Sequence, residues 1–142
     1  MKEKFDYDYT SGDFKKQYYI FKSYGYDVTK VRLGMILQKA ATQGELPIVI
    51  FALNNGPNVH YNDDTALKFA SEAGHYEIVK YLVEHGANIH AENDLSVKEA
   101  IKNGNLEIVK HLVENGAVID DKAIKLSIKY GKHDITQYLM QK

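Results

Sequence analysis

Two interleaved series of glycines constrain this chain more than any other feature of its sequence. Gly44, Gly74 and Gly104 recur at a constant interval of about 30 residues, and Gly131 follows after a slightly shorter one. The second series has nearly the same interval and consists of Gly25, Gly56, Gly86 and Gly116. A fixed period of about 20–50 residues is the signature of solenoids and repeat arrays. The chain is therefore expected to be a stack of similar units.

The segments that precede the glycines have the apolar spacing of helices. Ile78, Val79, Leu82 and Val83 lie on one face of a helix with 3.6 residues per turn. Glycine often follows a helix because it adopts the left-handed backbone conformation without a steric penalty. Each unit is therefore predicted to be a helix pair, at about residues 33–54, 65–84, 95–114 and 122–141.

The connections between the units carry a common apolar position. A β-branched residue lies three positions after each glycine of the second series, at Val28, Val59, Ile89 and Ile119. These side chains are expected to fill the space between neighbouring units.

Two segments carry a family resemblance. GHYEIVKYLVEHGANIHA, at Gly74–Ala91, resembles the second helix and following turn of ankyrin repeats, and GNLEIVKHLVENGAVI, at Gly104–Ile119, repeats it. The resemblance covers the chain from about Gly25 onward. The short period, the TALKFASEAGH segment and the GANIH ending are most similar to the ankyrin proteins of giant amoeba viruses of the mimivirus type. The resemblance implies an all-α solenoid that binds protein partners without catalysis.

The sequence departs from the ankyrin pattern in its connections. Ankyrin units have about 33 residues and a TPLHxAA signature. At that place this chain reads TALKFAS, LSVKEAI and KAIKLSI, with Lys68, Lys98 and Lys125 instead of the histidine. The three missing residues fall where ankyrins carry a β-hairpin finger, so shortened or absent fingers are expected. Three more are missing between Gly116 and Ile124, which predicts a tight turn.

The N-terminal part resembles a worn repeat. Phe14, Tyr18 and Phe21 predict one helix that ends before Gly25. We interpret residues 1–31 as a degenerate N-terminal cap of a single domain spanning 1–142, with residues 1–11 partly ordered. The tyrosines of this region either form an exposed interface, where tyrosine is favoured, or pack within the cap, which is the interpretation we prefer. They are Tyr7, Tyr9, Tyr18, Tyr19, Tyr24 and Tyr26.

Charge and cysteine content limit the classes of partner and the cellular compartment that we expect for this protein. A net charge of −1 argues against bulk attraction to nucleic acid or anionic membrane. The chain contains no cysteine, and its start, MKEKFDYDYT, does not resemble a secretory leader, so we expect an intracellular protein in the host cytoplasm. Its apolar runs are much shorter than the ~18–20 residues of a membrane span. We expect a monomer with a protein partner.

No group of residues predicts catalysis, a metal or a cofactor. His60, His90 and Asp120 occupy one repeat position, but stacked helices lie ~8–10 Å apart, whereas zinc ligands must lie ~2.0–2.1 Å from the metal. No nucleophile and base form a recognisable set. Asp63 and Asp64 are expected to face solvent, like Asp120 and Asp121.

The predicted binding site consists of positions that differ between units while the apolar frame stays the same. In ankyrins the concave face is formed by the tips between repeats and the exposed edge of the first helices. Two equivalent sets at that edge are Thr42, Glu72, Lys102 and Lys129, and Gln43, Ala73, Asn103 and Tyr130. The tips contribute Tyr61, Asn62, Asp63 and Asp64, then Glu92, Asn93 and Asp94, then Asp120 and Asp121.

The acidic tips predict a partner with a basic surface, for example a host protein. Two alternatives stay open at the level of sequence. In the first alternative, the varying positions are polar residues that face solvent and bind no partner. In the second, the repeats are a structural spacer, or a fragment, of a larger multidomain ankyrin protein.

Overall fold

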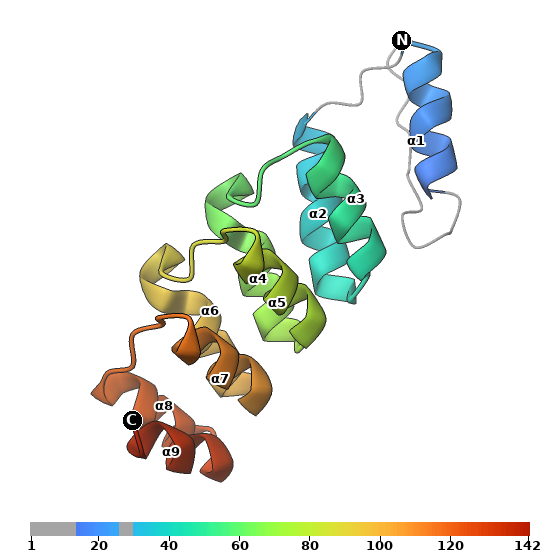
Figure 1. Cartoon of the computed structure of the whole chain (residues 1–142). Helices are drawn as coiled ribbons and strands as arrows, with labels where there is room; N and C mark the ends of the chain where they lie inside the picture. The colour runs from blue at the N-terminus through green and yellow to red at the C-terminus, as the bar shows by residue number, and fades with distance from the viewer. Residues whose placement is uncertain (1–13, 26–29) are drawn as a thin grey trace.

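The computed structural model describes residues 14–25 and 30–142, which form a stack of helices (Figure 1). No strand occurs in these two ranges, which confirms the all-α solenoid with shortened fingers. The helices are α1 Phe14–Ser23, α2 Lys30–Gln43, α3 Leu46–Asn55, α4 Tyr61–Ala73, α5 Tyr76–Glu84, α6 Ala91–Asn103, α7 Leu106–Glu114, α8 Asp121–Lys129 and α9 His133–Met140.

Helices α2 to α9 form four consecutive pairs, each consisting of a first and a second helix. The first helices, α2, α4, α6 and α8, pack more closely on one another than the second helices do. The stack therefore curves with its first helices on the inner, concave side. One core runs through the four pairs, and it includes Leu37, Leu67 and Val97 at the same repeat position.

The first glycine series ends the first helices and also allows the pairs to approach each other. Gly44 and Gly74 have φ of 81° and 84°, in the left-handed region. A Cβ at Gly44 would lie 2.7 Å from the His75 ring, whose Nε2 is 2.9 Å from the Thr42 carbonyl oxygen. Asn105 repeats this contact over Gly74 and donates to the Ser71 carbonyl. At Gly44 and again at Gly74, the absence of a side chain therefore leaves room for a polar residue of the next repeat, His75 and Asn105 respectively.

The shortened connections contain a left-handed turn instead of a hairpin. Asn62, Asp63 and Asp64 have φ of 52–58°, and Glu92, Asn93 and Asp94 repeat this conformation. Left-handed backbone costs roughly 1–2 kcal/mol per residue, but Asn and Asp tolerate it because their short side chains bond locally. This turn directs the aspartate at its end toward the next repeat.

The last connection lacks this turn, as its further three-residue deletion predicts. Asp120 has an extended backbone, and its side chain accepts a hydrogen bond from the Ala123 amide at 3.0 Å. Helix α8 therefore begins directly after a side-chain cap of the usual kind.

Helix α1 covers the N-terminal end of the stack. Tyr18 is buried against Leu33, Ile36 and Phe51, and the Tyr18 and Phe51 rings meet edge-on with centroids 5.1 Å apart. This packing agrees with our preferred interpretation for Tyr18, whereas Tyr19 and Tyr24 are exposed. Residues 1–11, for which partial order is expected, lie outside the described residues.

Replacing Gly34 with alanine is expected to lower the free energy of unfolding by ~1–3 kcal/mol, the range for overpacking a filled site. Gly34 lies on α2, and a Cβ there would overlap the ring of Tyr61, which packs against the core. Urea denaturation measures the change. The control is the same substitution in a Tyr61→Ala background, where alanine has room and the loss should disappear. An equal loss in both backgrounds would show that Tyr61 is not the obstacle.

Candidate protein-binding face

The candidate site lies on the first helices and the turns that precede them. Thr42, Glu72 and Lys129 are exposed at the C-terminal ends of α2, α4 and α8, and Lys102 is half-buried at the equivalent place on α6. The Thr42 hydroxyl donates to the Gln38 carbonyl, so its orientation is set by its own helix. These four positions carry a hydroxyl, a carboxylate and two ammonium groups on the same backbone frame.

Lys102 is the charged group of this set with a clear partner. Its Nζ lies 3.1 Å from Glu99 Oε1. The hydrogen bond that Lys102 donates to Glu99, together with the negative charge of Glu99, raises the pKa of Lys102 above its ordinary value. Lys102 therefore stays charged, but it shares that charge with Glu99 on the same face.

The next set of predicted positions is also accessible. Gln43, Ala73, Asn103 and Tyr130 are all exposed. The Asn103 amide donates to the Glu99 carbonyl and closes the end of α6. Tyr130 lies beside Lys129, whose Nζ is 5.8 Å from the ring centroid. The members of this set are therefore all accessible to a partner.

The turns divide the predicted tip residues into two groups. Asn62, Asp63, Glu92 and Asn93 are exposed, as are Asp120 and Asp121 at the last connection. Tyr61, in contrast, is half-buried and packs against the core next to Gly34. The ring of Tyr61 therefore fills space between repeats.

The expectation that Asp64 faces solvent is wrong. Its exposed fraction is 5%. One carboxylate oxygen accepts a hydrogen bond from the Asn88 amide at 2.8 Å, and the same oxygen lies 3.0 Å from His60 Nδ1. The left-handed turn points this carboxylate inward, where it joins its own turn to the connection of the next repeat.

Asp94 makes the same link one repeat later. It accepts a hydrogen bond from the Val118 amide at 3.1 Å, and His90 Nδ1 lies 2.9 Å away. The imidazoles of His60 and His90 are themselves half-exposed. Each histidine–aspartate pair therefore connects two repeats, and these aspartates differ from the other acidic residues of the tips.

Sequence reasoning left Lys68, Lys98 and Lys125 out of the site. They occupy one repeat position on the first helices, between the tips and the helix ends. Lys98 donates to the Asn93 carbonyl at 2.6 Å, and Lys68 lies over the Phe69 ring. Their regular spacing in place of the ankyrin histidine was the signal that could have identified them. The face thus has acidic tips and a row of lysines behind them.

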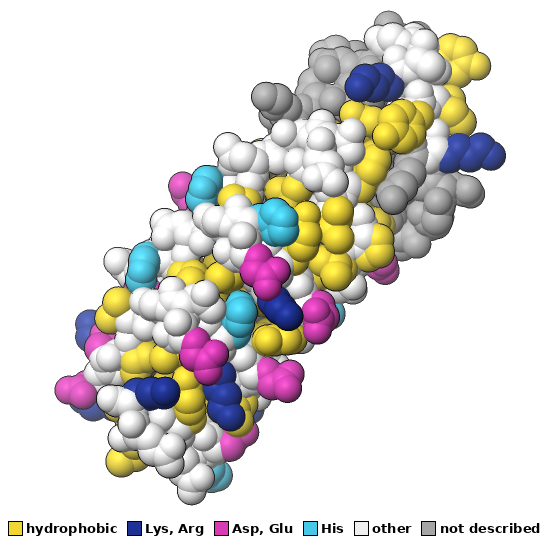
Figure 2. All heavy atoms as spheres, viewed as in Figure 1, with side chains coloured by type: hydrophobic (Ala, Val, Ile, Leu, Met, Phe, Trp, Pro, Cys, Tyr) yellow, Lys and Arg dark blue, Asp and Glu magenta, His cyan; other side chains and the backbone are white. Residues whose placement is uncertain are grey.

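The second helices carry a different surface. Figure 2 shows hydrophobic side chains gathered over α3, where the sequence LPIVIFALNN has no charged residue, and side chains of both charges over α5 and α7. The exposed charges on α5 and α7 include Lys80, Glu84, Lys110 and Glu114. This outer surface offers a matched reference for the inner face.

Comparison with known families decides the classification. The family model described as ankyrin repeats (3 copies) matches residues 15–93, more than half of the chain. The chain belongs to the ankyrin-repeat family. No curated protein matches this ankyrin-repeat protein. The described residues contain no helix with the length and hydrophobicity of a membrane span. The helix pairs of the structure continue beyond the matched region through α9.

Proposed function

We propose that this ankyrin-repeat protein is a non-catalytic scaffold that binds a protein partner through its concave face. Ankyrin repeats are generally protein–protein interaction modules. The observation that supports the proposal is that the buried apolar positions are the same in each repeat, whereas the exposed positions at the ends of the first helices differ. Leu37, Leu67 and Val97 are buried at one repeat position, whereas the exposed edge of the same helices changes from Thr42 to Glu72. A rigid frame presents variable groups without a large ordering cost on binding.

The charges on this face define the kind of partner that fits. Asp63, Glu92 and Asp121 form an acidic line along the tips, and the lysines at 68, 98 and 125 form a parallel basic line. A partner with a basic ridge against the tips and carboxylates opposite the lysines would match both lines. Such complementarity acts mainly on the association rate and on specificity. Asp64 and Asp94 are excluded from this contact surface because they link the repeats.

We propose further that the protein acts as a monomer in the cytoplasm of a cell infected by a giant virus, on a host protein. The support is the sequence resemblance to mimivirus-type ankyrin proteins and the absence of cysteine, which suits a reducing compartment. Immunofluorescence of infected amoebae tests the location.

Reversing the charges of the tips is expected to slow association with the partner about tenfold at low salt. The variant combines Asp63→Lys, Glu92→Lys and Asp121→Lys, all at exposed positions. The partner is first isolated by affinity purification from host lysate, and association rates are then measured with the purified partner at several salt concentrations. The difference between wild type and variant should shrink as salt screens the charges.

The matched control replaces three exposed glutamates of the second helices with lysine, in the variant Glu84→Lys, Glu107→Lys and Glu114→Lys. It makes the same change in net charge and should leave the association rate nearly unchanged. Circular dichroism verifies that both variants fold. Weaker binding in the outer-surface variant alone would contradict the concave-face proposal.

A further inference from the structure

Helix α8 carries a row of three lysines on its inner side. Lys122, Lys125 and Lys129 are separated by three and four residues, so they lie on one face of the helix, and all three are exposed. The equivalent positions on α6 include Lys98 and Lys102, which belong to the concave face. The α8 lysine row, as we call these three residues, therefore lies on the concave side of the stack.

The earlier first helices carry less positive charge at the same positions. On α2 these positions hold Met35, Gln38 and Thr42, and on α4 the charges of Lys68 and Glu72 cancel. On α6 there are two lysines, and one of them shares its charge with a glutamate of the same helix. The adjacent row of positions has no net charge and consists of Lys39, Phe69, Glu99 and Leu126. Positive charge is therefore concentrated at the α8 end of the concave face.

The lysines at these positions on α4 and α6 have partners within their own helix. Lys68 Nζ lies 5.4 Å from the centroid of the Phe69 ring. Lys98 donates to the Asn93 carbonyl oxygen at 2.6 Å, and Lys102 is paired with the glutamate three residues before it. Each partner lies in the same helix as its lysine. The contacts of these lysines therefore do not depend on a following repeat.

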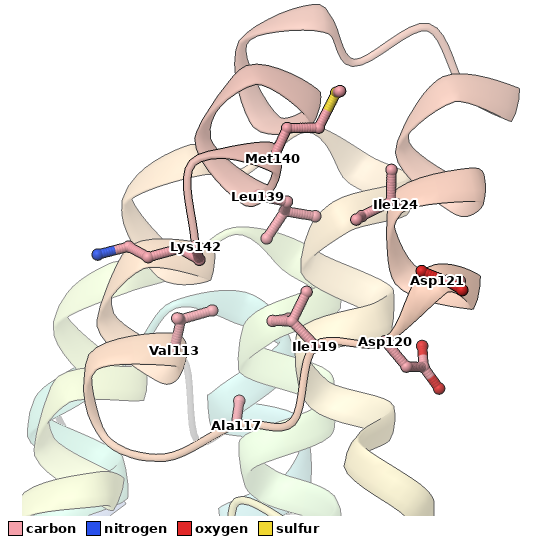
Figure 3. A pocket seen from close by; sticks show the side chains of 9 residues that line it. All are labelled: Val113, Ala117, Ile119, Asp120, Asp121, Ile124, Leu139, Met140 and Lys142. Carbon is pink, nitrogen blue, oxygen red and sulfur yellow. The ribbon is translucent and has the colours of Figure 1, made fainter.

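The α8 lysine row has no comparable carboxylate partner. Within residues 14–25 and 30–142, none of its three lysines forms an ion pair. Figure 3 shows the acidic side chains closest to the row in the sequence, Asp120 and Asp121, at the start of α8. The Asp120 carboxylate accepts the hydrogen bond from the Ala123 amide that caps the helix. The positive charges of the row are therefore not neutralised within their own helix.

These lysines are also unfavourable for the stability of α8. Like charges three and four residues apart repel each other on a helix surface. Lys122 lies in the first turn, where the helix dipole disfavours a positive charge, whereas Lys129 lies in the last turn, where the dipole favours one. The stability of the helix therefore does not account for the row, but binding of an oppositely charged partner does.

We propose that the α8 lysine row binds an acidic helix of the partner protein, an inference that rests on the protein-binding function proposed above for the concave face. The ends of the row lie about 10 Å apart along α8, given the rise per residue of an α-helix. Carboxylates at i, i+3 and i+7 of a second helix have the same spacing and match the lysines one to one. Leu126 is half-buried and Tyr130 is exposed next to the row, so both offer apolar contact.

The test uses a synthetic alanine-based helical peptide with glutamates at i, i+3 and i+7, titrated into the full chain at low salt. Saturable shifts of the amide NMR signals of residues 122–130 are expected, and a peptide with glutamines instead of glutamates should cause none. The variant Lys122→Gln, Lys125→Gln and Lys129→Gln should bind the glutamate peptide about tenfold more weakly. Arginine at the same three positions keeps the charge and should retain binding.

The matched control removes three exposed lysines from other helices, in the variant Lys16→Gln, Lys80→Gln and Lys110→Gln. It makes the same change in net charge and should bind the peptide as the wild type does. Equal weakening in both variants would show that overall charge, and not the row, attracts the peptide, and would overturn the proposal. Tighter binding of a single-stranded DNA oligonucleotide than of the peptide at the row would overturn it in favour of a nucleic acid.

Thermal unfolding at low salt separates a binding role of the row from a structural one. Lys122→Gln alone should raise the melting temperature, because it relieves both the repulsion and the unfavourable position at the helix start, and glutamine has nearly the same helix propensity as lysine. A lower melting temperature would mean that the lysine stabilises the fold and would overturn the proposal, as would the absence of saturable shifts in the wild-type chain. These measurements do not require the natural partner, so their failure is distinct from failure of the charge reversals at the tips, which test the concave-face proposal itself.

Discussion

Truncating Leu82 or Leu112 to alanine is expected to lower the free energy of unfolding by ~2–5 kcal/mol, through lost transfer free energy and the cavity that remains. Both side chains are fully buried, at equivalent positions on α5 and α7. They belong to the core that joins successive pairs. Their loss therefore weakens the contact between repeats as well as the packing within one pair.

Chemical denaturation followed by circular dichroism measures this effect. Glu84→Ala is the control, since Glu84 is exposed on α5 and its loss should change the free energy by no more than ~0.5 kcal/mol. A broader transition in the leucine variants would indicate that the two halves of the stack unfold separately. Equal sensitivity at all three positions would mean that the buried face of the second helices has been identified incorrectly.

Replacing Asp64 with alanine is expected to cost ~1.5–3 kcal/mol more than replacing its neighbour Asp63, the range for a hydrogen bond to a charged group. Asp64 is buried and accepts a hydrogen bond from the Asn88 amide, with His60 beside it. Asp63 is exposed. Because both have φ of 56–58°, alanine introduces the same backbone strain at each position, and the difference isolates the carboxylate.

Urea denaturation of the two variants gives this difference directly. Asp94→Ala and Asn93→Ala form a second pair with the same geometry one repeat later, and they should behave alike. If Asp63→Ala and Asp64→Ala prove equally destabilising, then left-handed strain, and not the link to the next repeat, determines the stability of these turns.

The sequence predicted the exposure of the candidate-site residues at the helix ends correctly, but it did not predict the burial of Asp64 in the turn. Thr42, Glu72 and Lys129 lie at the ends of regular helices, where spacing from the apolar positions indicates which residues face solvent. Asp63 and Asp64 are adjacent in the sequence and chemically identical, so composition predicts the same exposure for both. Successive positions in the left-handed turn place the two side chains differently, with the Asp63 carboxylate in solvent and the Asp64 carboxylate against the next repeat.

The sequence by itself determined the period, the helix pairs and the absence of full hairpin fingers. These features depend on local properties: glycine's left-handed freedom, the 3.6-residue spacing and the number of residues in each connection. The tertiary structure decided which polar residues join the repeats and which remain available to a partner. That choice depends on where a neighbouring repeat places its backbone amides, such as those of Asn88 and Val118. Residues 24 positions apart in the sequence meet there only after the pairs have stacked.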